Sequence, residues 1–325
     1  MRILRLVLRR LSLSIPCLGI ILAVLFFLLQ LAPGDAVDAL IGQMGTSDDT
    51  LSKLLRSYYG LDGSVVAQFT GYLGRLVTLD LGLSVAYGTP VLALILERLP
   101  VTVVLMVTSM AMAFTAGCVV GVIAARYVHR WPDTIISVLG MLVYSMPSFW
   151  FGLMAIVLFA VTLGWLPAGG ISDLRAGHTG LALMLDMAKH LVMPALTLGL
   201  IFFAVYLRVM RTAMLEVMTL DFMRTARAKG LQERAVLFRH ALRNALLPMV
   251  TIAGLQASSM LGGAVVVESV FSLPGLGRLA QEAVVQRDLN MLLGITVMSS
   301  VLVIVVNLVI DIIYAKLDPR IDVGA

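Results

Sequence analysis

The feature that most constrains this chain is a series of long apolar stretches separated by polar segments. A hydrocarbon layer about 30 Å thick needs roughly 20 predominantly apolar residues to be crossed by a helix. Six stretches of this kind lie at about Leu11–Leu31, Val101–Ala125, Ile135–Leu163, Leu191–Leu207, Met249–Val270 and Met291–Tyr314. The third is interrupted by Pro147. The sequence therefore predicts an all-α membrane protein with six transmembrane helices.

The composition excludes the main soluble classes. Hydrophobic residues make up 60% of the chain and charged residues 13%, whereas ordinary globular domains have about 45–50% and about 25%. The 24 basic and 19 acidic residues are too few to cover a soluble domain of this size. A water-soluble enzyme, a disordered chain and a disulfide-stapled secreted domain are thus excluded. Cys17 and Cys118 both lie in apolar stretches and are interpreted as small buried hydrophobic residues.

The first apolar stretch follows a basic start, which is also a property of signal peptides. Its apolar length exceeds the 7–15 residues of a signal-peptide core, and no convincing small-x-small cleavage site follows. We interpret it as a retained anchor.

The distribution of Lys and Arg predicts an orientation. With the N-terminus in the cytoplasm, the cytoplasmic segments hold 16 basic and 7 acidic residues, against 8 and 12 outside. Cytoplasmic loops carry the excess of Lys and Arg, so both termini are predicted to be cytoplasmic. We expect one transmembrane domain over residues 1–325, with an extracytoplasmic segment at 33–99 and a cytoplasmic loop at 208–247.

The extracytoplasmic segment opens with Pro33-Gly34-Asp35, a helix-stopping turn. Amphipathic pieces follow at Leu51–Tyr59 and Val65–Val77. This pattern favours a small folded cap, with a plain linker as the alternative.

The cytoplasmic loop concentrates charge, because eight of the 24 basic residues lie in it. Residues 221–230 predict a short helix that ends at Gly230, where glycine suits the left-handed position after a helix. A second helix is expected to end at Pro248, with an apolar face formed by Leu231, Ala235, Phe238, Leu242 and Leu246. The residues alone leave two interpretations open. The loop either lies on anionic lipid headgroups or forms a compact knob that docks a cytoplasmic partner.

Several activities lack the residues that they need. The four histidines form no HxxxH or HExxH spacing, and no GxxxxGK[ST] motif occurs, so neither a histidine metal site nor a P-loop is predicted. Ionisable groups are scarce inside the apolar stretches, which disfavours an ion-driven secondary transporter. A membrane-embedded hydrolase is disfavoured because His190 has no apparent nucleophile partner.

Candidates for a wet pathway are polar residues inside the third and fifth stretches, namely Tyr144, Ser145, Ser148, Gln256 and Ser259. Small and polar residues also serve helix packing in membranes, and that alternative stays open at each position.

Several motifs resemble one family. They are residues 224–230 (RTARAKG) with 239–248 (RHALRNALLP), the Pro33-Gly34-Asp35 turn, residues 80–84 (DLGLS), residues 268–277 (ESVFSLPGLG), and the tail from 307–311 (NLVID) to Asp318-Pro319-Arg320. Together they resemble the bacterial ABC importer permeases of the dipeptide/oligopeptide/nickel group over nearly the whole chain. The broad importer pattern is Glu-Ala-Ala, three residues and Gly. This chain has Arg224-Thr225-Ala226 there, a departure typical of the peptide branch.

The resemblance implies a type I importer permease fold and a non-catalytic subunit of the bacterial inner membrane. It implies as partners a second, usually non-identical permease, two ATPase subunits that bind ATP and Mg²⁺, and an extracytoplasmic substrate-binding protein. It implies no cofactor in this chain, no metal and no nucleic acid. Di- or oligopeptides are the expected substrate; nickel chelates, glutathione or sugars are the alternatives. Contact with the ATPase is expected at Asp221, Arg224, Thr225, Ala226, Arg227, Ala228, Lys229, Gly230 and Glu233.

Overall fold

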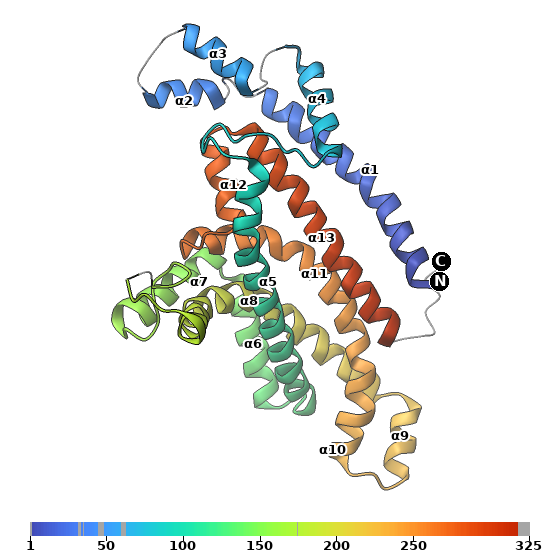
Figure 1. The fold of residues 1–325 in the computed structure, drawn as a ribbon. Helices are drawn as coiled ribbons and strands as arrows, with labels where there is room; N and C mark the ends of the chain where they lie inside the picture. Colours follow the sequence, from blue (N-terminus) through green and yellow to red (C-terminus); the bar gives the residue numbers. More distant parts are fainter. Residues whose placement is uncertain are drawn as a thin grey trace. The chain divides into compact units, whose positions relative to one another are not determined.

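The computed structural model describes residues 2–31, 34, 36–44, 49–59, 63–173 and 175–317. These residues form helices and connecting turns, with one isolated bridge between Leu83 and Pro90. They divide into two compact units: unit 1 comprises residues 1–102 and 274–305, and unit 2 comprises residues 103–273 and 306–325. Two long helices, α5 (Val91–Arg126) and α13 (Leu289–Leu317), contribute to both units (Figure 1).

Besides parts of α5 and α13, unit 1 contains four N-terminal helices and α12. They are α1 (Arg2–Gln30), α2 (Ala36–Met44), α3 (Asp49–Tyr59), α4 (Val65–Val77) and α12 (Leu276–Val285). The described residues of the segment expected to be a cap or a linker thus include the three short helices α2, α3 and α4. Tyr72 of α4 is buried with Leu22 and Phe26 of α1 and Leu293 of α13, so apolar burial fixes α4 to its neighbours.

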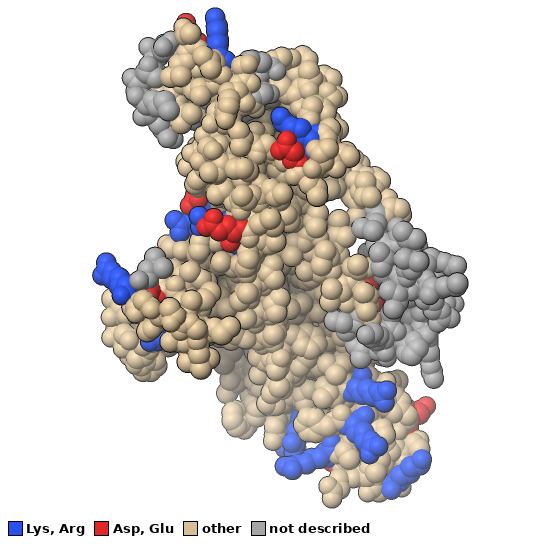
Figure 2. All heavy atoms as spheres, viewed as in Figure 1, with Lys and Arg blue, Asp and Glu red and all other residues tan. Residues whose placement is uncertain are grey.

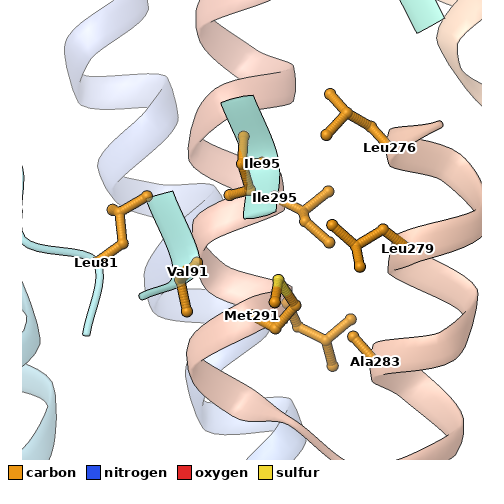
Figure 3. Close-up of a cluster of buried hydrophobic side chains, with 9 residues drawn as sticks. Leu81, Val91, Ile95, Leu276, Leu279, Ala283, Met291 and Ile295 are labelled. Atoms are coloured by element: carbon orange, nitrogen blue, oxygen red, sulfur yellow. The ribbon is translucent and has the colours of Figure 1, made fainter. Parts of the chain in front are cut away.

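A second apolar cluster joins four segments of unit 1. Leu81 comes from the loop between α4 and α5, which we call the 79–90 loop, and Val91 and Ile95 come from the start of α5. Figure 3 shows them facing side chains of α12 and α13, namely Leu276, Leu279, Ala283, Met291 and Ile295.

A buried carboxylate fixes the same loop. Asp288, which directly precedes α13, is fully buried. It accepts hydrogen bonds from Ser84 Oγ at 2.6 Å, the Ala86 amide at 3.2 Å and the Met291 amide at 3.1 Å. Buried charges are tolerated when such donors satisfy them. Asp288 therefore joins the 79–90 loop to the start of α13.

Unit 2 is organised around α8 (Gly180–Met218). Its other helices are α6 (Trp131–Ser145), α7 (Ser148–Ala155), the π-helix η1 (Ile156–Thr162), α9 (Asp221–Ala228), α10 (Glu233–Ala235), the π-helix η2 (Val236–Ala241) and α11 (Leu242–Val270). α6, α7 and α11 all pack against α8. The apolar window of α8 is 61% buried, against at most 33% for the other three long apolar helices. The interior of unit 2 includes several methionines whose side chains are at most 2% exposed, namely Met193, Met210, Met214, Met223, Met249 and Met260.

Glycines bring the backbone of α5 directly onto α8. A Cβ atom on Gly117 would lie 2.5 Å from Cβ of Tyr206, and one on Gly121 would lie 2.7 Å from Cβ of Met210. Real Cβ atoms do not approach so closely, so both positions need glycine. Small residues allow such close helix crossings in membranes.

The apolar helices agree with most of the predicted spans. Among the residues that the structure describes, four helices are long and apolar enough to cross a membrane: Val91–Arg126, Gly180–Met218, Glu233–Val270 and Leu289–Ile312. The stretch interrupted by Pro147 is a pair of helices, Trp131–Ser145 and Ser148–Thr162, bent by 102°. A shorter apolar helix covers Ser12–Leu28 within α1. The prediction of a multi-pass helical membrane protein is confirmed.

Some predicted boundaries were wrong. α8 extends well beyond the predicted fourth span at both ends, and the helix does not end at Pro248, which lies inside α11. Membrane helices tolerate proline because neighbouring groups satisfy the freed backbone positions. Cys17 is exposed and Cys118 is half-buried, so the prediction of two buried cysteines was wrong for Cys17.

Some sequence predictions concern residues outside the described set. They are Pro33 and Asp35 of the expected turn and the Asp318-Pro319-Arg320 tail. Gly34 between the first two is described, and its φ of +80° is left-handed.

Candidate functional site

The predicted short helix is present as α9, and we call residues 221–235 the α9–α10 corner. α9 places an acid, Asp221, in its first turn and Arg227 in its last, which suits the helix dipole. Met223 and Ala226 are buried, and the other residues of α9 are exposed. α9 packs on η2. It thus rests on unit 2 through one narrow face and leaves the rest of its surface open.

Gly230 reverses the chain after α9. Its φ is +76°, the left-handed conformation predicted from the sequence, and its amide donates to the Arg227 carbonyl at 2.9 Å. A Cβ atom at this position would meet nothing within 4 Å. The need for glycine here is therefore conformational and not steric.

An ion pair closes the corner beyond Gly230. Arg227 donates to the Glu233 carboxylate from Nε at 3.3 Å and from Nη2 at 3.0 Å. The hydrogen bond that Arg227 donates to the Glu233 carboxylate raises the pKa of the Arg227 guanidinium. Both side chains are largely exposed, so the pair orients the corner and adds little stability.

The corner has an exposed surface of mixed character. Figure 2 shows Lys and Arg gathered at the α9–α10 end of unit 2. Exposed apolar side chains lie in the corner, at Phe222 and Leu231, and close to its two ends, at Leu220 and Phe238. Apolar and aromatic side chains within a charged rim are typical of protein interfaces. Sequence analysis missed Leu220 and Phe222 as surface residues.

The predicted apolar face of the second helix was wrong at Leu231, which precedes the helix, and at Phe238; its other members, Ala235, Leu242 and Leu246, are half-buried. Leu231 and Phe238 are exposed, whereas Val236, Leu237, Ala241 and Ala245 are buried. The physical reason is η2, because a π-helix has more residues per turn than an α-helix. It shifts the buried positions to Leu237, Ala241, Ala245 and Met249, a strict four-residue spacing.

The candidate pathway residues fall into two groups. Tyr144, Ser145 and Ser148 lie at the bend between α6 and α7, and Tyr144 and Ser145 are exposed. Arg208 of α8 lies 6.0 Å from the Tyr144 ring centre. Gln256 and Ser259 lie on α11, where Gln256 is half-buried and Ser259 exposed.

Their neighbour Ser258 serves packing. It accepts a hydrogen bond from Asn307 of α13 at 3.2 Å. α7, which begins at Ser148, packs against α11, but among the described residues no hydrogen bond joins the residues at the bend to Gln256 or Ser259.

Comparison with known families decides the class. Residues 117–323 match the binding-protein-dependent transport system inner membrane component, and residues 3–106 match the N-terminal region of such membrane components. The chain belongs to this family of transport permeases. Membership implies a transport system that includes a binding protein.

Relatives of this permease extend over nearly its whole length. It is 40% identical to the oligopeptide transport system permease protein AppB of Bacillus subtilis, over 97% of this chain and 98% of the relative. It is 39% identical to the di/tripeptide transport system permease protein DppB of Pseudomonas aeruginosa, over 96% and 97%. It is 38% identical to the glutathione transport system permease protein GsiC of Escherichia coli, over 97% and 98%.

The fold has a solved counterpart. A chain of the inward-facing MetNI methionine ABC transporter superposes with a TM-score of 0.56 at 18% identity, covering 70% of this permease and 97% of that chain. At this identity the likeness concerns the fold alone.

Proposed function

We propose that this chain is a membrane subunit of an ATP-driven importer of di- or oligopeptides. The main observation behind this proposal is that almost the full length of the chain matches oligopeptide and di/tripeptide permeases at 39–40% identity. The third relative is named for glutathione, itself a tripeptide, which supports the same class. Hydrolysis of ATP belongs to partner subunits, because the chain has no P-loop.

The α9–α10 corner is the proposed contact with the ATPase. Three observations support it: α9 is anchored through only two buried residues, its remaining surface is open, and it directly follows the central helix α8. The contact residues are those expected from the sequence, Asp221, Arg224–Gly230 and Glu233. Exposed Leu220 and Phe222 add an apolar component.

The proposed topology has six crossings. α1, α5, the bent α6–α7 pair, α8, α11 and α13 supply them, and an even number places both termini on one side. The excess of Lys and Arg puts that side in the cytoplasm. Residues 33–99 are then extracytoplasmic, and the α9–α10 corner faces the cytoplasm of a bacterial inner membrane.

The complete importer would contain two permeases, two ATPases with their ATP and Mg²⁺, and a substrate-binding protein. The second permease is a homologous, non-identical chain. Substrate passes near Tyr144, Ser145, Ser148, Gln256 and Ser259. The binding protein selects the substrate, and the ligand moves because the two states of the permease bind it differently.

The test uses the backbone requirement at Gly230. Gly230→Val forces a β-branched residue into the left-handed region, whereas Gly230→Asn keeps that conformation accessible. Because the site is open, the two variants differ in backbone preference and not in crowding. In reconstituted complexes we expect Gly230→Val to separate ATP hydrolysis from peptide uptake while the chain still inserts, and Gly230→Asn to stay close to wild type.

Unchanged uptake and unchanged binding-protein-stimulated ATP hydrolysis in Gly230→Val would refute the proposed role of the corner. Uptake that followed a proton gradient instead of ATP would refute the importer class itself.

A further inference from the structure

A two-pronged ion pair joins α6 to α8 in unit 2. Arg211 donates from Nε to Asp133 Oδ1 at 2.6 Å and from Nη2 to Asp133 Oδ2 at 2.8 Å. The Asp133 side chain is 7% exposed and that of Arg211 27%. A guanidinium and a carboxylate that meet through two parallel hydrogen bonds fix orientation as well as distance.

Asp133 also holds the turn between α5 and α6. It is the third residue of α6 and accepts a hydrogen bond from the backbone amide of His129 at 3.1 Å. His129 has a φ of +61°, a conformation that a non-glycine residue adopts only with local support. One carboxylate therefore connects the α5–α6 turn, the first turn of α6 and α8.

The pair lies between the α9–α10 corner and the bend. Arg211 precedes the end of α8 at Met218 by about two helical turns. The junction from α8 to α9 is short and hydrogen-bonded, with the Leu220 amide donating to the Val217 carbonyl and the Met223 amide to the Leu220 carbonyl. In the other direction, α6 leads from Asp133 to the 102° bend.

Two further contacts between α6 and α8 are less directional than this ion pair. A Cβ atom on Gly140 of α6 would lie 3.6 Å from a methyl group of Leu207, an ordinary van der Waals contact. Arg208 faces the Tyr144 ring at the outer limit of a cation–π contact. Apolar contacts are non-directional, so they hold the helices together without preventing them from sliding. Asp133 and Arg211 supply the fixed register.

We propose that Asp133 and Arg211 are positioning residues for transport: their ion pair makes α6, and with it one arm of the bend, follow α8 when α9 is displaced. This inference rests on the proposed docking of the ATPase at α9. It assigns the two side chains a mechanical role in coupling and no contact with substrate.

The first test measures whether α6 and the end of α8 move as one body. Spin labels are placed at Thr134 of α6 and Glu216 of α8, both exposed, after Cys17→Ser and Cys118→Ala. Distances are recorded in the reconstituted complex without nucleotide and after trapping with ATP and vanadate. We expect one unchanged distance in the otherwise wild-type chain and a shifted or broadened distribution in Asp133→Asn on trapping.

Arg130→Gln is the matched control, because Arg130 is an exposed arginine of the same turn; we expect it to behave as wild type. Arg211→Lys keeps the positive charge but loses the two parallel hydrogen bonds of the guanidinium. The distance distribution should then be broadened by an intermediate amount. The exchange of both residues, Asp133→Arg with Arg211→Asp, should narrow the distribution again. A distance that changes on trapping in the wild-type chain, or one that stays unchanged in Asp133→Asn, overturns the proposal.

The second test measures uptake of radiolabelled trialanine per ATP hydrolysed. We expect Asp133→Asn to lower this ratio by about three- to tenfold, which lies within the roughly two- to thirtyfold range of mutations along a coupling path, and Arg130→Gln to leave it unchanged. An unchanged ratio in Asp133→Asn also overturns the proposal. Failure of the wild-type complex to take up trialanine would contradict the proposed substrate. Normal coupling in Gly230→Val would contradict the proposed ATPase contact at the α9–α10 corner. In either case the distance measurement still decides the role of the ion pair.

Discussion

Two chain reversals in this permease both use a left-handed glycine, one in a packed environment and the other in an open one. Gly82 in the 79–90 loop has a φ of +79°, and Gly230 in the α9–α10 corner has a φ of +76°. Beside Gly82, a Cβ atom would lie 3.3 Å from Asn290 Nδ2, whereas beside Gly230 it would meet nothing within 4 Å. The carboxylate near the first reversal, Asp288, is fully buried, while the Glu233 side chain near the second is 66% exposed.

The difference shows where each reversal obtains its rigidity. The 79–90 loop is held by the chain itself, through satisfied buried polar groups that are costly to disturb. The α9–α10 corner is held by its backbone and an exposed ion pair, and it leaves its surface free for a partner. Substitutions should therefore affect stability at the first reversal and function at the second.

The largest effect on stability is expected from Asp288→Ala. It leaves the hydroxyl group of Ser84 and the amides of Ala86 and Met291 without their acceptor. The loss in the free energy of unfolding should be about 3–5 kcal/mol, measured by titration with a denaturing detergent in micelles. Glu233→Ala is the counterpart at the exposed reversal and should cost at most about 1 kcal/mol. Equal losses for the two variants would contradict the comparison.

The two glycines provide a more direct contrast. Gly230→Ala should cost about 1–2 kcal/mol, because an L-residue is strained in the left-handed region. Gly82→Ala carries the same strain and also presses on Asn290, whose Nδ2 donates to the Leu83 carbonyl at 3.0 Å. Its midpoint in the same detergent titration should be the lower of the two. The reverse order would mean that Asn290 moves away freely.

Ser84→Ala tests a single member of the buried network. Loss of the 2.6 Å hydrogen bond to Asp288 should cost about 1–3 kcal/mol. Thr225→Ala removes an exposed hydroxyl that bonds to the Asp221 carbonyl, and its cost should stay within about 0.5 kcal/mol. Thermal unfolding in detergent compares the two. A Thr225→Ala loss as large as that of Ser84→Ala would show that the corner is more tightly held than its exposure indicates.

The smallest effect concerns the exposed ion pair. A double-mutant cycle of Arg227→Gln and Glu233→Gln should give a coupling free energy of about 0.2–1 kcal/mol. This coupling should decline as salt is added, because exposed charges are screened. A coupling that salt leaves unchanged would indicate that the pair is shielded from solvent.

Local features of the corner could be predicted from the sequence. The helix over Asp221–Ala228 and the left-handed Gly230 depend on charges and a glycine within ten residues of chain. The apolar stretches likewise gave the long membrane helices. The proposed contacts with substrate and ATPase stay predictions.

Features that depend on distant residues could not be predicted. Ser84 and Asp288 are 204 positions apart, and Asp133 and Arg211 are 78 apart; nothing in either local sequence indicates the partner. The buried face of η2 was missed because its period differs from that of an α-helix. Pro248 was misjudged because its effect depends on neighbouring helices.

The buried methionines of unit 2 have a consequence for oxidative chemistry. The thioethers of Met210, Met214 and Met223 are fully buried, so peroxide reaches them only when the helices around α8 separate. Oxidation converts each one into a polar sulfoxide, which the closed packing does not accommodate. The rate of sulfoxide formation at these positions therefore reports how often unit 2 opens, and measuring it requires no label on the permease.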